Sequence, residues 1–181
     1  MEIINEPMSG LKVLKLDRFE DERGYFIETY NRREFLKVGI DAEFQQDNCV
    51  WSQKDVIRGL HCQLVPHEQG KLISCVQGAI LDVAVDFRPE SSTFLDHFSI
   101  DLTQDNNLIF WIPKGFAHGY SVQSRMAVVN YKCDSLWNPK HESGVRWDDP
   151  VLNIDWKIEN PIVSAKDQEL REIDPIDAGV V

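Results

Sequence analysis

The residues best suited to chemistry in this chain are a histidine, two cations and a phenol. A short motif holds Arg58 and His61, and Lys71 follows Gly70 at the start of an alternating apolar run. Histidine has an ordinary pKa of about 6.5 and can accept a proton near neutral pH, whereas a cation can stabilise an oxyanion. Further along lies Tyr131, whose hydroxyl can return a proton. These groups together suit removal of a proton from a carbon beside a ketone, followed by its return.

Such a reaction sets clear requirements on the site. A hydrogen beside a ketone is acidic only because the resulting carbanion delocalises onto oxygen as an enolate. Each unit of pKa mismatch between carbon acid and base amounts to about 1.4 kcal/mol, so the oxyanion must be stabilised. Inversion also requires an acid on the face opposite the base.

Plainer interpretations exist for each of these side chains. A single histidine such as His61 can be a hydrogen-bonded core residue, and Lys71 can be a solvated lysine at a strand edge. Tyr131 can be a core aromatic whose hydroxyl has a partner. The elements that carry these residues therefore matter.

The strand expected at residues 126–134 carries the phenol. Tyr131 shares one face of it with Ala127, Val129 and Cys133, whereas polar residues occupy the other face. Because the neighbours on its face are small and apolar, we expect Tyr131 to point inward.

Other strands are expected at 10–17, 25–28, 81–87, 97–103 and 108–112. In the third of these, Leu81, Val83 and Val85 share one face while Asp82 and Asp86 share the other. This alternation predicts a strand that is buried on one face only.

Helical patterns are few and short. One helix is expected at residues 31–38, with Asn31 as its N-cap and Gly39 at its end, and another at residues 167–173, opened by Ser164. Many short strands with little helix predict a jelly-roll sandwich or barrel that can hold one small ligand.

Length and composition indicate one globular domain over residues 1–181, with 43% hydrophobic and 27% charged residues. No apolar run approaches the roughly 20 residues that span a bilayer, and residues 1–8 lack the basic and apolar regions of a signal peptide. We therefore expect a cytoplasmic protein without a membrane partner. The four cysteines form no CxxC pair and are expected to be reduced packing residues.

The formal net charge of −11 argues against nucleic acid as a partner, because the general field repels it. A small anionic substrate requires a local cluster of cations. Screening over about 8 Å allows such a cluster to act locally. Its candidates are Arg23, Arg58, Lys71 and Lys166.

Seven segments, in order along the chain, together resemble one known family: 19–28, 46–48, 58–61, 69–72, 112–119, 147–150 and 164–167. They are similar to the dTDP-4-dehydrorhamnose 3,5-epimerase family.

The resemblance implies an all-β, cupin-type jelly roll (double-stranded β-helix) with a few short peripheral helices, and no metal or other cofactor. It also implies a homodimer in which N-terminal strands, about residues 1–30, are exchanged and help complete the partner's site. The implied substrate is dTDP-4-keto-6-deoxyglucose, inverted at C3 and C5 on the way to L-rhamnose.

The resemblance also implies roles for individual residues. His61 matches the base, Asp167 its carboxylate partner, Lys71 the cation beside the ketone oxygen, and Tyr131 the acid. Trp137 falls where a tyrosine commonly stacks on the thymine ring. The residues that match substrate-binding positions are Arg23, Phe26, Glu28, Gln46, Asp47, Asn48, Arg58, His118, Trp137, Glu142 and Lys166.

Several alternatives stay open at this point. Asp167 follows Ser164 at capping-box spacing and can serve only the helix backbone. His118 and His61 sit where other cupins carry metal ligands, although the usual clustered His-x-His is missing. The protein can also be a C3-only epimerase, a 3,4-ketoisomerase, a metal-dependent cupin oxygenase or isomerase, or a sugar-nucleotide-binding cupin without activity.

Overall fold

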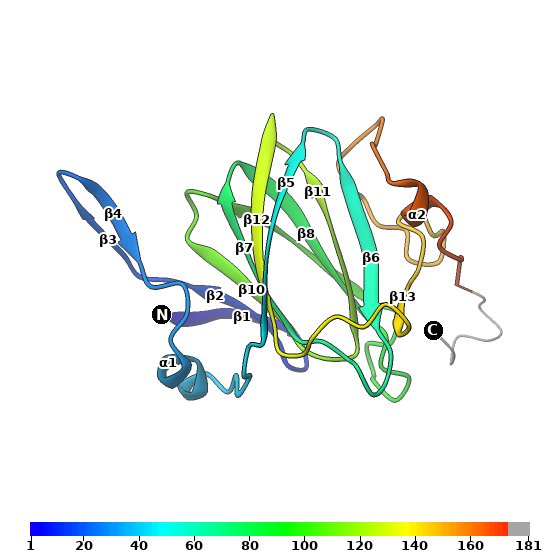
Figure 1. The fold of residues 1–181 in the computed structure, drawn as a ribbon, viewed down its shortest axis with the longest axis horizontal. Helices are drawn as coiled ribbons and strands as arrows, with labels where there is room; N and C mark the ends of the chain where they lie inside the picture. Colours follow the sequence, from blue (N-terminus) through cyan, green and yellow to red (C-terminus); the bar gives the residue numbers. More distant parts are fainter. Residues whose placement is uncertain (174–181) are drawn as a thin grey trace.

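The computed structural model describes residues 1–173, and antiparallel strands make up most of it (Figure 1). The last residues of the expected domain, 174–181, lie outside the described part. The strands are β1 (Glu2–Met8), β2 (Leu11–Lys15), β3 (Arg18–Asp21), β4 (Gly24–Ile27), β5 (Gln46–Gln53), β6 (Ile57–Gln63), β7 (Lys71–Gln77), β8 (Ala79–Asp86), β9 (His97–Thr103), β10 (Leu108–Ile112), β11 (Phe116–Val122), β12 (Met126–Cys133) and β13 (Glu142–Gly144). The helices are α1 (Arg32–Lys37) and α2 (Ala165–Gln168).

Two sheets pack face to face as a barrel (Figure 1). One has the strand order β1-β2-β10-β7-β12-β5 and the other has the order β13-β6-β11-β8-β9. Every pair of neighbouring strands in these sheets is antiparallel. This arrangement confirms the predicted all-β, cupin-type jelly roll.

The apolar residues between the sheets form the largest hydrophobic cluster, which includes Phe110, Leu11 and Ile73. A second cluster lies on the outer face of the five-stranded sheet. There, Trp156 and Ile173 from the C-terminal part of the chain cover the apolar face of β8 and its neighbours. Burial of these apolar surfaces on both sides of one sheet supplies the main driving force for folding.

This second cluster corrects the prediction for the strand at 81–87. Leu81 and Val83 are buried under the C-terminal segment, but Asp82 and Asp86 on the other face have no exposed surface either. The alternation predicts one solvent-exposed face and one buried face, whereas β8 is buried on both. A carboxylate inside a barrel requires a partner, and for Asp82 this is the imidazole of His118.

Helix α1 confirms the expected helix, because the Asn31 side chain caps it by accepting from the Arg33 amide. Helix α2 corrects the second expectation. It begins after its N-cap Ser164 and ends at Gln168, so it covers less of the chain than the expected 167–173. Among residues 1–173, no helix is long and apolar enough to cross a membrane.

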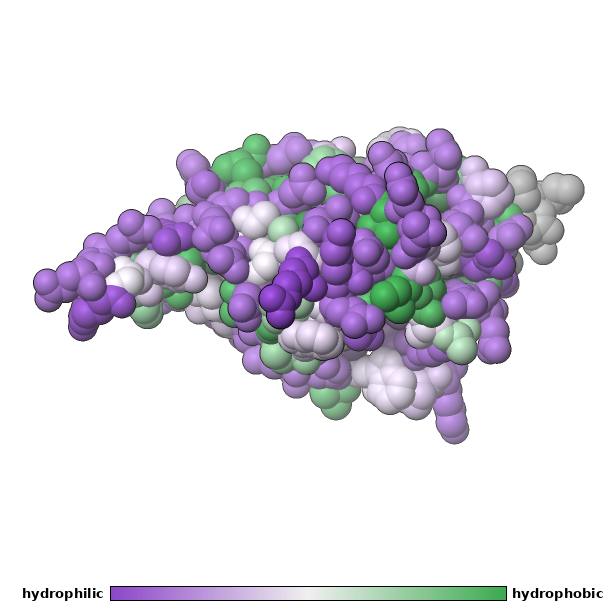
Figure 2. Space-filling view, turned by 90° about the horizontal axis from the view of Figure 1, so that it is seen from above, coloured by the Kyte–Doolittle hydropathy of each residue, from purple (hydrophilic) through white to green (hydrophobic). Residues whose placement is uncertain are grey.

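Strands β3 and β4 pair only with each other, and they form an arm that projects away from the barrel (Figures 1 and 2). The arm exposes aromatic side chains: Phe19 is 62% exposed and Phe26 is 64% exposed. An isolated two-stranded hairpin is marginally stable in water, so this arm lacks the packing that supports the other strands.

Candidate active site

A cavity of about 580 Å³ lies between the two sheets. Its walls come from β5, β6, β7, β12 and β13 and from the segments before β7 and after β12. The volume falls within the range of about 300–1,000 Å³ that small-molecule sites occupy. The lining residues are Gln46, Asn48, His61, Cys62, Gln63, Gln69, Lys71, Tyr131, Cys133, Leu136, Trp137 and Glu142.

The imidazole of His61 has a carboxylate partner. His61 Nε2 lies 2.8 Å from Asp167 Oδ1, and the Gly59 amide donates to Asp167 Oδ2 at 3.2 Å. Burial opposes the charged form of Asp167, but the hydrogen bonds from His61 and the Gly59 amide hold the pKa of its carboxyl below the ordinary value. Because a carboxylate only accepts, Nε2 carries the proton, and Nδ1 holds the lone pair that can take another.

The capping alternative for Asp167 is compatible with this contact. Its backbone amide donates to the Ser164 hydroxyl at 3.1 Å, which is the N-cap interaction of α2. Its carboxylate does not turn back to the Ser164 amide and instead bonds to His61 and the Gly59 amide. The same short helix therefore provides both an N-cap and a partner for the imidazole.

Gly59 brings β6 close to β11. A Cβ at this position would lie 2.6 Å from Gly119 Cα and 2.7 Å from the His118 carbonyl, and the φ of Gly59 is +113°. Only glycine tolerates both conditions. The close approach makes His61 and His118 direct neighbours across the two strands.

Lys71 lies inside the barrel, so the interpretation as a solvated lysine at a strand edge is wrong. Its side chain is 8% exposed, and its ammonium lies 3.5 Å from the His61 carbonyl oxygen. Burial lowers the pKa of Lys71, because the charged form loses its hydration. An ammonium held in this way costs free energy of folding, and it is also well placed to oppose negative charge formed in the cavity.

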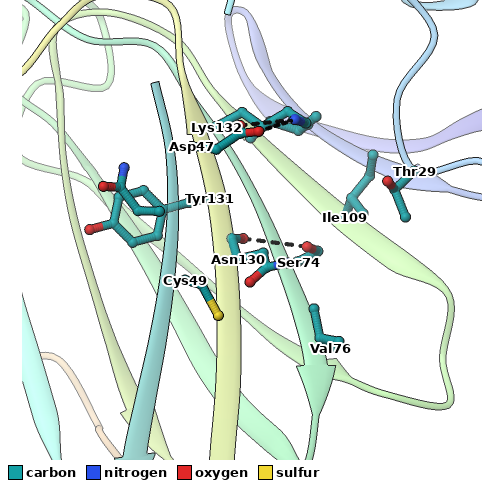
Figure 3. A pocket seen from close by; sticks show the side chains of 11 residues that line it. Thr29, Asp47, Cys49, Ser74, Val76, Ile109, Asn130, Tyr131 and Lys132 are labelled. Atoms are coloured by element: carbon teal, nitrogen blue, oxygen red, sulfur yellow. Dashed lines mark hydrogen bonds and ion pairs between the residues drawn. The ribbon is translucent and has the colours of Figure 1, made fainter. Parts of the chain in front are cut away.

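Tyr131 reaches the cavity from the opposite sheet. It pairs with Asn48 and Ile73 on the neighbouring strands and packs against the core cluster between the sheets. Figure 3 shows its ring on the opposite side of β12 from Asn130 and Lys132, which confirms the predicted inward direction. Burial raises the pKa of Tyr131, so the hydroxyl keeps its proton at neutral pH.

Three more of the expected residues form a network at the cavity edge. The Glu142 carboxylate accepts from Trp137 Nε1 at 3.3 Å and pairs with the Lys166 ammonium at 2.7 Å. Burial opposes the charge on Glu142, but Lys166 holds its pKa below the ordinary value. The backbone amide of Trp137 also donates to Gln46 Oε1 at 2.8 Å, so both the backbone and the indole of this residue are hydrogen-bonded at the cavity edge.

His118 and Arg58 do not line the cavity, although His118 is the cross-strand neighbour of His61, which does. The Arg58 guanidinium donates to Ser52 Oγ at 3.0 Å. His118 Nε2 lies 3.0 Å from both carboxylate oxygens of Asp82. Within residues 1–173, no three His, Cys, Asp or Glu side chains gather as metal ligands would.

Four expected substrate-binding residues lie away from the cavity. Arg23 and Phe26 are on the exposed arm, and Glu28 follows it. Asp47 faces the outside of the six-stranded sheet, where its carboxylate binds Lys132 at 2.9 Å (Figure 3). A separate hollow of about 240 Å³ lies on that outer face.

Sequence reasoning did not assign a site role to five residues that line the cavity: Cys62, Gln63, Gln69, Cys133 and Leu136. The two cysteines fit their expected role as reduced packing residues. All four cysteines are free, and burial raises the pKa of Cys62 and Cys133 to about 11, which keeps both thiols protonated. The phase of β12 was a signal for Cys133, which shares the inward face with Tyr131.

A family model described as dTDP-4-dehydrorhamnose 3,5-epimerase matches residues 5–174. The chain belongs to this family. Among curated members, the dTDP-4-dehydrorhamnose 3,5-epimerase of Shigella flexneri is 42% identical over 92% of this chain and 93% of its own length.

Solved epimerase structures agree in fold as well as in sequence. The dTDP-4-dehydrorhamnose 3,5-epimerase of Bacillus anthracis, with TDP and PPi bound, superposes with a TM-score of 0.93 at 40% identity, covering 95% of this chain and 99% of its own. The dTDP-6-deoxy-D-glucose-3,5-epimerase of Legionella pneumophila, in complex with dTDP-4-keto-L-rhamnose, gives 0.92 at 41% identity, covering 98% of this chain and 95% of its own. These matches confirm the epimerase family and the isomerase class that the sequence predicts.

Proposed function

We propose that the protein epimerises C3 and C5 of a dTDP-linked 4-keto-6-deoxy-hexose, as in dTDP-L-rhamnose biosynthesis, without a cofactor. The observation that carries this proposal is the meeting of three groups in one cavity. His61, backed by Asp167, enters from one sheet, Tyr131 enters from the other, and the ammonium of Lys71 lies near His61. Family membership supports the same reaction.

Each group has one role in the proposed steps. Nδ1 of His61 takes the proton from the carbon beside the ketone, and the electron pair of the broken C–H bond forms an enolate on the C4 oxygen. Lys71 stabilises that oxyanion in a site of low dielectric, where a fixed charge is most effective. Tyr131 then returns a proton to the opposite face of the carbon. Its own proton is replaced from solvent, and His61 releases the abstracted proton to solvent.

The nucleotide end of the substrate is proposed to bind beside Trp137. Its indole donates to Glu142 and its backbone amide donates to Gln46, so the ring is partly ordered before the base stacks on it and stacking costs less side-chain entropy. Lys166 and Arg58 are the nearby cations proposed to contact the substrate, and arginine suits phosphate because of its planar fork. A nucleotide-sugar substrate also fits the expected cytoplasmic location.

We further propose that residues 1–181 form one cupin-like domain that works as a homodimer. Arg23 and Phe26 are on the projecting arm and cannot serve the cavity of their own chain in this conformation. An arm that exposes aromatic residues suits packing on a second copy, where it would complete the partner's site.

The test is solvent exchange during turnover. Incubation with dTDP-4-keto-6-deoxyglucose in D₂O should place deuterium at both C3 and C5, and His61→Ala should lose this exchange. Its control is His97→Ala, which removes a histidine from β9 that is not part of the cavity. Exchange that persists in His61→Ala would refute the assigned base.

The same experiment separates the alternatives. Deuterium at C3 alone would indicate a C3-specific epimerase, and migration of the keto group would indicate a 3,4-ketoisomerase. Binding without any exchange would indicate a non-catalytic sugar-nucleotide-binding protein. Activity that falls after EDTA treatment and returns with added metal would indicate a metal-dependent cupin.

A further inference from the structure

Two glutamines, one from each sheet, hold the segment that carries Trp137. Gln46 is on β5, at the edge of the six-stranded sheet, and its Oε1 accepts from the Trp137 backbone amide at 2.8 Å. Gln63 is on β6 in the five-stranded sheet, and its Oε1 accepts from the backbone amide of the next residue, Asn138, at 3.0 Å. Two successive amides are therefore tied to different sheets at the edge of the cavity.

Gln63 has no role in the reaction proposed above, although it lies in the wall of the cavity. Its side chain lines that cavity and the residue is only 7% exposed. A backbone N–H that is shielded from water needs an acceptor, and Gln63 supplies one for the part-buried amide of Asn138.

Asn138 is hydrogen-bonded through all of its polar groups. Besides the contact with Gln63, its side-chain nitrogen lies 3.0 Å from His67 Nε2, its Oδ1 accepts from the Lys140 amide at 3.0 Å, and its carbonyl oxygen accepts from the His141 amide at 3.0 Å. Of these partners, Gln63 is the one that lines the cavity. This contact therefore fixes the residue after Trp137 relative to the cavity wall.

The indole of Trp137 is held less firmly than the backbone that carries it. The residue is 51% exposed, and its Nε1 donates to Glu142 at 3.3 Å, which is a long distance for an N–H···O bond. The position of the ring thus depends on where the backbone places Cα and Cβ. Without the acceptor of Gln63, the backbone on the C-terminal side of Trp137 would be freer, and the ring would sample more positions before a ligand binds.

We propose that Gln63 is a positioning residue for nucleotide binding, which sets the place of the Trp137 indole by holding the Asn138 amide. It acts through Trp137 and not by contact with the substrate. The inference rests on the proposed function, because it assumes that a nucleotide base stacks on this indole.

The test is a double-mutant cycle with dTDP as the ligand, whose Kd is measured by isothermal titration calorimetry. Gln63→Met nearly keeps the length of the side chain and removes the acceptor. An aromatic side chain that becomes ordered only on binding weakens affinity by about two- to tenfold, so Gln63→Met should raise the Kd for dTDP by that factor. In a Trp137→Ala background the same substitution should change Kd by less than about twofold, because two residues that act as one unit are not additive.

Steady-state kinetics give an independent readout. Stacking on the base contributes equally to binding of the substrate and of the transition state, so Gln63→Met should raise KM and leave kcat within about twofold of the wild type. The matched control is Gln123→Met, which removes side-chain hydrogen bonds to Ser121 Oγ and the Trp156 carbonyl, away from the cavity. It should leave both KM and the Kd for dTDP unchanged.

An equal rise in Kd with and without Trp137 would overturn the proposal, because it would mean that Gln63 does not act through the indole. A fall in kcat with KM unchanged would also overturn it. If Gln63→Met does not fold, Gln63→Asn takes its place in the cycle, because it keeps a polar amide but is one methylene too short to reach the Asn138 amide.

Deuterium exchange by the wild type is scored separately. A wild type that binds dTDP and exchanges, with additive effects in the cycle, would refute this inference alone. A wild type that neither binds dTDP nor exchanges would refute the proposed function.

Discussion

His61 Nε2 lies 2.8 Å from Asp167 Oδ1, although 106 residues separate the two positions in the chain. The contact joins β6 to α2, which belongs to the C-terminal segment on the outer side of the five-stranded sheet. The tautomer of the proposed base thus depends on the docking of the C-terminal segment, which also brings Lys166 to Glu142 at the cavity edge.

The first prediction follows from this contact. Asp167→Asn should lower kcat by about 100-fold or more, because the amide no longer holds the proton on Nε2 of His61. The matched control is Ser164→Ala, which removes the N-cap and leaves the carboxylate. It should cost about 1 kcal/mol of unfolding free energy, measured by urea denaturation, with most of kcat retained. Equal losses of activity in both variants would show that activity depends on an intact helix α2 and not on the contact of the Asp167 carboxylate with His61.

The same carboxylate predicts a pH dependence of stability. The pKa of Asp167 is lower in the folded protein than in the unfolded chain. Its contribution to stability is therefore complete above the unfolded value of about 3.9 and is lost as pH falls through the folded value. The difference in unfolding free energy between wild type and Asp167→Asn should shrink over this acidic range in urea titrations. A difference that stays constant would contradict the depressed pKa.

A third prediction concerns Lys71, where function and stability should change in opposite directions. Lys71→Met removes a buried ammonium and keeps the length of the side chain, so it should abolish turnover and raise the unfolding free energy by about 0.5–2 kcal/mol. The control is Lys132→Met on the outer face of the same sheet. It should change stability by no more than about 0.5 kcal/mol and retain turnover. Loss of stability in Lys71→Met would contradict this prediction, because it would mean that interactions in the substrate-free protein fully offset the lost hydration of the ammonium.

The sequence predicts the features that depend on residues close together in the chain. The phase of β12 indicated that Tyr131 points inward, and the spacing around Asn31 indicated a capped helix. Both depend on neighbours within a few residues, which local periodicity can describe.

Contacts between distant segments were beyond such reasoning. Asp82 alternates with apolar residues as a solvent-facing residue would, and only the second sheet makes its face an interior one. The burial of Leu81 and Val83 under the C-terminal segment could not be predicted from the sequence either, because it depends on the tertiary packing of Trp156 and Ile173. The motif at residues 58–61 is visible in the sequence, but the need for glycine at position 59 comes from its contact with Gly119, which requires the pairing of β6 with β11.

A fourth prediction separates the acid from the base. Tyr131→Phe removes the hydroxyl and leaves His61 and its partner intact, so deuterium exchange at C3 or C5 should outlast net inversion. The control is Tyr120→Phe, a second buried tyrosine, whose hydroxyl lies 3.5 Å from Ser52 Oγ. That variant should keep the wild-type ratio of exchange to inversion. NMR of the product after reaction in D₂O measures both quantities, and their equal loss in Tyr131→Phe would count against the assigned division of labour.

The last prediction concerns the arm. If the arm of one chain completes the cavity of its partner, defects in the arm and in the base should complement each other. Arg23→Ala and His61→Ala chains with different affinity tags can be co-expressed and their heterodimer isolated. One of its two sites then combines an intact His61 with the partner's intact arm, so it should show roughly half the wild-type activity in a symmetric dimer.

The reciprocal heterodimer provides the control. When both substitutions are in one chain and the other chain is wild type, an arm acting on the partner leaves each site with one defect, and activity should be lost. An arm that folds back onto its own chain predicts the reverse, with activity in this heterodimer and none in the first. The two heterodimers contain the same substitutions in equal number, so a general loss of stability cannot produce the contrast. The exposed position of Phe26 and Arg23, away from the cavity of their own chain, favours the first outcome.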